Sequence, residues 1–174
     1  MFKDFDISSF KKQKPPSDNS FDTDQEIKAL KKIPLRKEFV KKYDDIEAAF
    51  KKTAEEQGVK DYDKKIAAKL IKESAPVILE LKKYHNRPRP YDLDSGLKAV
   101  KMKSMNTPSY PSGHSAQGML IASVLKDKYG KSSAFMQTAK NISDSRNIAH
   151  AHYKSDSVNG IKLGKKLYKH IKKN

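Results

Sequence analysis

Residues 145–156, S-R-N-I-A-H-A-H-Y-K-S-D, place a guanidinium, an imidazole and a carboxylate within a dozen positions of one another. His152 and Asp156 are four residues apart, so one helical turn can bring their side chains together. A neutral imidazole with one N–H held by a carboxylate presents the lone pair of its other nitrogen to an electrophile. Arg146 suits an anionic electrophile, because its planar fork matches phosphate oxygens two at a time. The stretch therefore predicts phosphoryl transfer through a histidine nucleophile.

The spacing within this stretch also predicts where its helix ends. Arg146 and His152 are six residues apart, which on one straight helix turns them about 120° away from each other. Both can face a single ligand only if the helix ends between them, or if they flank the ligand from different sides. We therefore expect a break near residues 149–151, where Ala149 and Ala151 permit a tight approach, with His152 leading into the final helix.

Hydrophobic spacing in the rest of the chain is helical, and the sequence shows neither period-two alternation nor many β-branched residues. The predicted fold class is all-α, with residues 24–174 forming one helical domain preceded by a polar arm at residues 1–23. Gly58 closes one predicted helix, and Pro76 is expected to kink or split another. The helices are predicted at residues 24–32, 35–57, 62–84, 112–130, 132–149 and 155–173.

Composition indicates one ordinary domain that attracts anions. The 174 residues include 37 lysines and arginines against 21 acidic residues, which gives a net charge of +16. The positive electrostatic field of such a chain favours anionic partners, which include small phosphates, nucleic acid and an acidic lipid surface, but it does not distinguish among them. Most individual lysines are expected to be solvated. The absence of cysteine excludes disulfides and thiolate metal sites.

The apolar runs of the sequence are short. None within residues 1–10 has the length of a secretion signal, and the patches at residues 75–81 and 119–125 fall far short of a membrane span. We therefore expect a soluble protein and assign it by default to the cytoplasm. The sequence leaves the oligomeric state open and allows a homo-oligomer.

A basic segment at residues 82–90, K-K-Y-H-N-R-P-R-P, ends a predicted helix and enters a loop stiffened by prolines. Arg87 and Arg89 are both followed by proline, so either could be the arginine that binds an anion. Taken alone, the segment is better explained as a basic helix end whose cations complement their own carbonyl groups.

Residues 110–114, Y-P-S-G-H, open a helix that is rich in small residues. Ser112 can cap this helix, and the free N–H groups of the first turn form an anion site, with Gly113 letting an oxyanion approach the backbone. His114 would then lie beside the bound anion. Pro-Ser-Gly also occurs in ordinary turns, so this motif gains weight only together with the other two segments.

Together the three segments resemble the signature of the PAP2 superfamily, the type 2 phosphatidic acid phosphatases, which also contains bacterial class A acid phosphatases and vanadium haloperoxidases. That signature reads Lys, six residues, Arg-Pro; then Pro-Ser-Gly-His; then Ser-Arg, five residues, His, three residues, Asp. It selects Arg89, because the residue seven positions before Arg87 is Glu80 and not lysine. The resemblance covers about residues 82–164 and is strongest to the soluble class A enzymes. The matching residues are Lys82, Arg89, Pro90, Pro111, Ser112, Gly113, His114, Ser145, Arg146, His152 and Asp156.

The resemblance implies a single-domain helical bundle of the PAP2, acid phosphatase and vanadium haloperoxidase type. It implies hydrolysis of phosphomonoesters through a phosphohistidine without a metal or other cofactor, with His152 as nucleophile, Asp156 holding it and His114 as general acid and base. The expected partner is a phosphorylated small molecule, with phosphate or vanadate fitting the same site; a lipid phosphate at a membrane surface is the alternative substrate. The implied phosphate ligands are Lys82, Arg89, Ser112, Gly113 and Arg146.

Two departures and three alternative functions accompany this resemblance. Pro108 stands where the superfamily often has glycine before Ser-Tyr. His150 stands where the superfamily commonly has glycine, so it is expected to crowd the turn or to add a titrating group. A metal site of His150, His152 and Asp156 is disfavoured, because alternate residues on a helix point about 200° apart. Vanadate-dependent peroxidation is disfavoured because nothing in so short a chain suggests halide-binding machinery. A basic nucleic-acid-binding protein would keep salt-sensitive DNA binding after His152→Ala, but nucleic acid is not an expected partner of the phosphatase.

Overall fold

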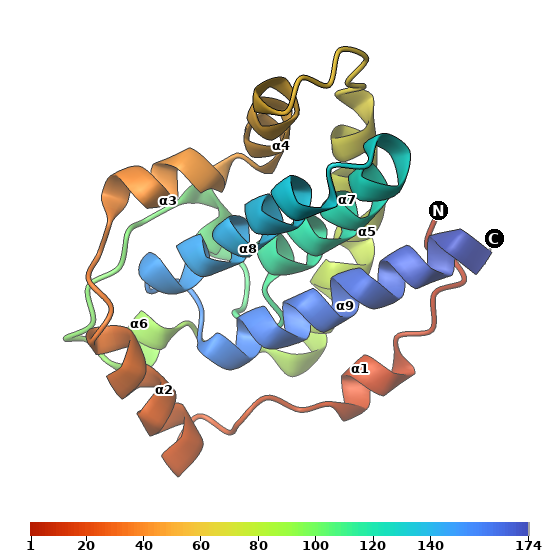
Figure 1. Ribbon diagram of the computed structural model, residues 1–174. Helices are drawn as coiled ribbons and strands as arrows, with labels where there is room; N and C mark the ends of the chain where they lie inside the picture. Colours follow the sequence, from red (N-terminus) through yellow and green to blue (C-terminus); the bar gives the residue numbers. More distant parts are fainter. Residues whose placement is uncertain (174) are drawn as a thin grey trace.

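Helices form all the regular structure in residues 1–173, the part of the chain that this computed structural model describes (Figure 1). The prediction of an all-α fold in one compact domain is therefore confirmed. No helix among these residues is both long enough and apolar enough to cross a membrane. The helices are α1 (Ser8–Lys12), α2 (Phe21–Lys31), α3 (Lys37–Asp44), α4 (Ile46–Glu56), α5 (Lys65–His85), α6 (Pro90–Leu93), the 3-10 turn η1 (Lys103–Asn106), α7 (Gly113–Tyr129), α8 (Ser132–Ile148) and α9 (Lys154–Lys173).

Helix α7 is the central element, packed between α8 and α9 (Figure 1). A helix that is apolar or small on nearly every side must be buried on every side, which explains its position. Its buried side chains join those of α4, α5, α8 and α9 in the main core. They include Ala116, Leu120, Ile121, Ala122 and Leu125.

Two glycines let α9 lie directly against α7. A Cβ atom added at Gly160 would be 2.4 Å from the carbonyl oxygen of Ser112, and one at Gly164 would be 2.3 Å from that of Ala116. The backbones therefore touch where a side chain would stand. At one end of this contact, the Ser112 N–H donates a hydrogen bond of 3.0 Å to the Asp156 carbonyl. This joins the first turn of α9 to the residue before α7.

The break predicted at residues 149–151 is confirmed, since α8 ends at Ile148 and α9 begins at Lys154. His150 adopts a left-handed backbone conformation with φ of 56°, a conformation that glycine reaches without strain. Its ring nitrogens lie 2.7 Å from the Lys98 carbonyl oxygen and 2.8 Å from that of Ile33. His150 therefore ties the turn to two distant loops.

The single helix predicted at residues 35–57 is instead two helices, α3 and α4, so this prediction was wrong. Asp45 between them is extended, with φ of −87° and ψ of 103°, and its carboxylate accepts a hydrogen bond of 3.0 Å from the Ala48 N–H. An aspartate that caps a new helix competes with continuing the old one. By contrast, α5 runs unsplit through Pro76, because its apolar face is packed against the core on both sides of the proline.

The predicted polar arm at residues 1–23 is also corrected. Phe2 and Phe10 are buried in the main core, and the Phe10 carbonyl accepts a hydrogen bond of 3.0 Å from His85 of α5. Helix α2 begins at Phe21 with Ser20 as its cap, earlier than predicted. Aromatic residues spaced within a polar segment supply enough buried area to dock it, although they show no helical period.

Candidate functional site

Most of the predicted site residues line one cavity of about 190 Å³. They arrive from separate elements: the last turn of α5, the residue capping α6, the first turn of α7, the last turn of α8 and the turn before α9. These residues are Lys82, Arg89, Gly113, His114, Arg146 and His152.

Two predicted residues do not line this cavity. Asp156 lies fully buried behind His152, in the position of a group that orients the ring. Ser112 is turned to α7, where its hydroxyl accepts hydrogen bonds from the Ser115 N–H at 3.3 Å and the Ser115 hydroxyl at 2.9 Å. The structure thus gives Ser112 its predicted role as a cap, while its predicted contact with phosphate is not part of this arrangement.

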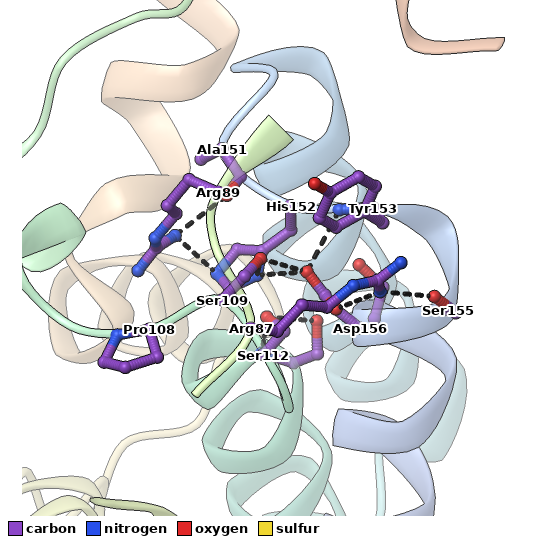
Figure 2. Close-up of polar contacts among 12 residues, drawn as sticks. Arg87, Arg89, Pro108, Ser109, Ser112, Ala151, His152, Tyr153, Ser155 and Asp156 are labelled. Atoms are coloured by element: carbon purple, nitrogen blue, oxygen red, sulfur yellow. Dashed lines mark hydrogen bonds and ion pairs between the residues drawn. The ribbon is translucent and has the colours of Figure 1, made fainter. Parts of the chain in front are cut away.

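The hydrogen bonds of His152 determine its tautomer (Figure 2). Its Nδ1 lies 3.1 Å from the Asp156 carboxylate, which only accepts, and its Nε2 lies 3.1 Å from Nη1 of Arg89, which only donates. The proton is therefore on Nδ1, and the lone pair is on Nε2 at the cavity. Burial lowers the pKa of His152 to about 3, and the charges of Arg89 and Lys82 act in the same direction. The ring is neutral at ordinary pH.

Asp156 is held by several donors besides His152. The Ser109 hydroxyl and the Tyr153 N–H donate to one of its oxygens, and Nη1 of Arg87 donates to the other at 2.8 Å (Figure 2). Burial alone would raise the pKa of Asp156, but the hydrogen bond with His152 and the charge of Arg87 hold that pKa below its usual value. The carboxylate therefore stays ionised without solvent.

The arginines of the two Arg-Pro pairs point to different partners. Arg89 lines the cavity and donates to the Ala151 carbonyl at 2.8 Å as well as to His152. Arg87 points away to Asp156 and to Glu26 of α2, and its guanidinium lies 3.7 Å from the centre of the Tyr153 ring. Arg89 is thus the arginine that can meet a ligand, and Arg87 positions the carboxylate.

Lys82 is buried on the floor of the cavity and donates to the carbonyl oxygens of Pro108 at 2.6 Å and Ser109 at 3.3 Å. Burial, followed by repulsion from Arg89, lowers the pKa of Lys82 to about 7. Two cations so close together are unfavourable without an anion between them. The pair therefore makes an anion site.

Arg146 adds a third cation, and one of its nitrogen donors is not used in a hydrogen bond within the described part of the chain. Its Nη1 forms an ion pair of 2.9 Å with the Asp44 carboxylate, but its buried Nη2 has no hydrogen-bond partner among residues 1–173. An unpaired buried donor is costly unless it serves a ligand. Burial lowers the pKa of Arg146, a direction that an anion in the cavity would oppose.

His114 also meets Asp44, through the backbone. Its Nε2 lies 2.9 Å from the Asp44 carbonyl oxygen, which only accepts, so the proton of the neutral ring is on Nε2 and a second proton must bind at Nδ1. Burial, together with the charge of Arg146, lowers the pKa of His114 to about 4. A negative charge in the cavity would raise this pKa again.

Sequence reasoning missed three contributors: Asp44, Ser109 and Arg87 in its positioning role. Asp44 was assigned to the middle of one long helix, and nothing in its neighbourhood signals a site, because it reaches Arg146 across 102 residues of chain. Ser109 directly precedes the Y-P-S-G-H motif, and that adjacency was the available signal. Arg87 was weighed as a ligand residue, yet the structure gives it a carboxylate partner instead.

The histidines outside the cavity have other contacts. His150, expected to crowd the turn or titrate beside the site, does not line the cavity and points to two backbone carbonyl oxygens. Within residues 1–173 no cluster of three or more histidine and acidic side chains is arranged to hold a metal ion. His150, His152 and Asp156 therefore do not converge as ligands.

No protein-family model matches the chain, and no curated protein matches it. The function is therefore inferred from the cavity itself. The cavity joins three cations, the open first turn of α7, a neutral imidazole whose unprotonated Nε2 faces Arg89 and a second imidazole beside them. Such a set can bind a tetrahedral anion, attack its central atom and transfer protons.

Proposed function

We propose that this protein hydrolyses phosphomonoesters through a phosphohistidine formed on His152, as a phosphatase of the PAP2 type related to class A acid phosphatases. One observation carries the proposal. Arg146, whose buried Nη2 has no hydrogen-bond partner among residues 1–173, lines one cavity with Lys82, Arg89 and His152, and the unprotonated Nε2 of His152 accepts a hydrogen bond from Arg89. Converging cations fit a multiply charged ligand, and an imidazole nitrogen without a proton beside them fits one whose central atom is electrophilic.

In the first step, Nε2 of His152 bonds to phosphorus in line as the P–O bond to the leaving group breaks. His114 gives the departing oxygen a proton from Nδ1, so an alcohol leaves. Asp156 stabilises the positive charge that grows on the His152 ring, in the manner of the carboxylate of a catalytic triad.

In the second step, water attacks phosphorus and His114 takes a proton from that water. The N–P bond breaks, inorganic phosphate leaves and His152 returns to its neutral form. Lys82, Arg89 and Arg146 hold the equatorial oxygens in both steps, and the N–H groups of the first α7 turn assist them. These cations neutralise the charge for which many phosphatases use a metal ion, so the proposed reaction needs none.

The active form has a neutral His152 and a protonated His114. In the free protein, the pKa of His152 is lowered to about 3 and that of His114 to about 4, so both conditions are met together under acidic conditions. The phosphate dianion opposes the desolvation of His114 and raises its pKa in the complex. Turnover should therefore extend from acidic toward neutral pH.

The first experiment assays phenyl phosphate in the presence of EDTA at a series of pH values. We expect the wild-type rate to rise from neutral to mildly acidic pH, and His152→Ala to lower kcat by about 1,000-fold or more while its circular dichroism spectrum stays helical. Radiolabelled phosphate should be trapped on the wild type by alkaline quench, since phosphohistidine is acid-labile, and not on His152→Ala.

His85→Asn provides the matched control, because His85 is a histidine outside the cavity that bonds the Phe10 carbonyl. It should retain activity within about twofold, the range of an ordinary surface change. A wild type without hydrolysis at any pH, or equal activity after His152→Ala, would remove the proposal.

A further inference from the structure

The cavity continues beyond its cations along one face of α5. Ala75, Ile78, Leu79 and Lys82 all line it, and their spacing of three, four and seven residues puts them on a single stripe of the helix. From Lys82 to Ala75 this stripe rises by about 10 Å. A ligand whose phosphate is at Lys82 therefore extends its other end over aliphatic side chains.

Helix α7 forms the opposite wall of this extension. Gly113 has no side chain, and a Cβ atom placed there would already be 3.4 Å from Ile78, so the two helices are close at the cations. One turn further on, Gln117 also lines the cavity. Its Nε2 donates to the Ile71 carbonyl at 3.2 Å and to the Ser74 hydroxyl at 3.4 Å. These two hydrogen bonds join α7 to α5, and they occupy the N–H donors of the Gln117 side chain.

The charges of the cavity are all at its other end. The charged or titratable residues that line it belong to the phosphate site described above. Met102 and Ser104 lie at that end too, since Arg146 is 3.1 Å from the Met102 sulfur and Arg89 donates to the Ser104 carbonyl at 3.3 Å. The extension between α5 and α7 is lined by Ala75, Ile78, Leu79 and Gln117. The hydroxyl groups of a sugar or polyol would lose hydrogen bonds to water against its three aliphatic side chains. An apolar group would gain from leaving water.

We propose that this extension, the apolar subsite of Ala75, Ile78, Leu79 and Gln117, binds the leaving group of the substrate and selects compact apolar ones, such as aryl groups. The inference rests on the proposed phosphatase function, because the phosphate anchors the substrate. The whole cavity of about 190 Å³ is below the roughly 300–1,000 Å³ of pockets for drug-sized ligands, so the leaving group must be small. Leu79, 42% exposed, forms the rim.

The test compares phenyl phosphate with glycerol 1-phosphate on the wild type and on Leu79→Ser. The variant should lower kcat/KM for phenyl phosphate about tenfold, the scale of a lost apolar contact in a specificity pocket, and leave glycerol 1-phosphate within about twofold. Leu93→Ser is the control, since Leu93 is a leucine of similar exposure, 38%, outside the cavity. It should change neither substrate.

A binding measurement separates this inference from the proposed function. Phenylphosphonate and methylphosphonate carry the same charged head and are not hydrolysed, so calorimetry compares their affinities whether or not the protein turns over substrate. We expect phenylphosphonate to bind about tenfold more tightly, and Leu79→Ser to remove the difference.

If the protein shows no turnover but still binds phenylphosphonate more tightly than methylphosphonate, the proposed phosphatase function is overturned and the apolar subsite is supported. Equal affinity for the two phosphonates, or an equal loss of both substrates in Leu79→Ser, would overturn the subsite. Preference for a long-chain alkyl phosphate over phenyl phosphate would equally contradict a compact leaving group and indicate a lipid substrate.

Discussion

Arg87 and Arg89 have nearly identical sequence surroundings and opposite roles. Each precedes a proline, yet the Arg87 guanidinium is buried against Asp156 and that of Arg89 faces the cavity. Local sequence sets neither outcome, because Asp156, which pairs with Arg87, and His152, which meets Arg89, are both more than 60 residues further along the chain. The carboxylate that orients His152 thus has its own cation, which leaves Arg89 available to a ligand.

Lys82 should make anion binding depend on pH. Its pKa of about 7 means that the free protein loses this cation as pH rises through neutrality, whereas His114 and His152 are already neutral there. Sulfate keeps its charge in this range. At constant ionic strength, its affinity should fall by up to about tenfold per pH unit above about pH 7. Calorimetric titration of sulfate from about pH 6 to about pH 8.5 measures this.

Neighbouring lysines supply the control for that titration. Lys82→Met should bind sulfate weakly and independently of pH, while Lys83→Met, which replaces an exposed lysine, should keep the wild-type profile. If Lys82→Met shows the same decline as the wild type, another group is responsible for it.

At the scale of elements, the site is assembled at the ends of helices. The last turns of α5 and α8 and the first turn of α7 each bring ligand residues, and the end of α3 brings Asp44. Asp44 arrives there because the chain breaks at Asp45 instead of continuing as one helix. The phosphate of the proposed substrate would therefore share Arg146 with the Asp44 carboxylate.

Gly160 tests how closely α7 and α9 must approach. In Gly160→Ala the new methyl group would meet a backbone oxygen, so the helices must move apart at the N-terminus of α7, where Gly113 and His114 line the cavity. We expect a loss of about 1–3 kcal/mol in the free energy of unfolding, the usual cost of overpacking, together with a reduction of the proposed phosphatase activity. Urea denaturation and the phenyl phosphate assay measure the two effects.

Gly118→Ala is the comparison within the same core. A Cβ atom there would be 3.4 Å from its nearest neighbour, Cγ2 of Ile142, which is an ordinary van der Waals distance. This variant should be clearly less destabilised than Gly160→Ala. Equal stability of Gly160→Ala and wild type would show that the α7–α9 contact is not limiting.

At the scale of the whole molecule, the buried histidines should weaken the fold in acid. In the folded protein His152 and His114 have pKa values of about 3 and about 4, below the ordinary value of 6.5. At pH values between 6.5 and these folded values, the unfolded chain therefore binds more protons than the folded protein. The contribution of the two neutral histidines to stability is full above about pH 6.5 and falls as pH decreases toward the folded pKa values. Between about pH 7 and about pH 5 we expect a loss of about 2–4 kcal/mol.

Urea denaturation at the two pH values checks this expectation. His152→Gln removes one of the two groups and should reduce the loss by about half. An unchanged loss in this variant would assign the acid sensitivity to other residues. The proposed enzyme would accordingly be most active at pH values where its fold is weakened.

The sequence by itself determined the all-α class and the break between α8 and α9, and its resemblance to a three-part signature named most of the predicted residues that line the cavity. Helical periodicity and motif spacing are local properties, and they are sufficient for these features. Only the tertiary structure decided that Asp44 pairs with Arg146, that Arg87 holds Asp156, that Ser112 turns to its own helix and that Phe2 and Phe10 enter the core. These outcomes depend on which surfaces pack together, and hydrogen bonds between residues far apart in the chain leave no pattern in either neighbourhood.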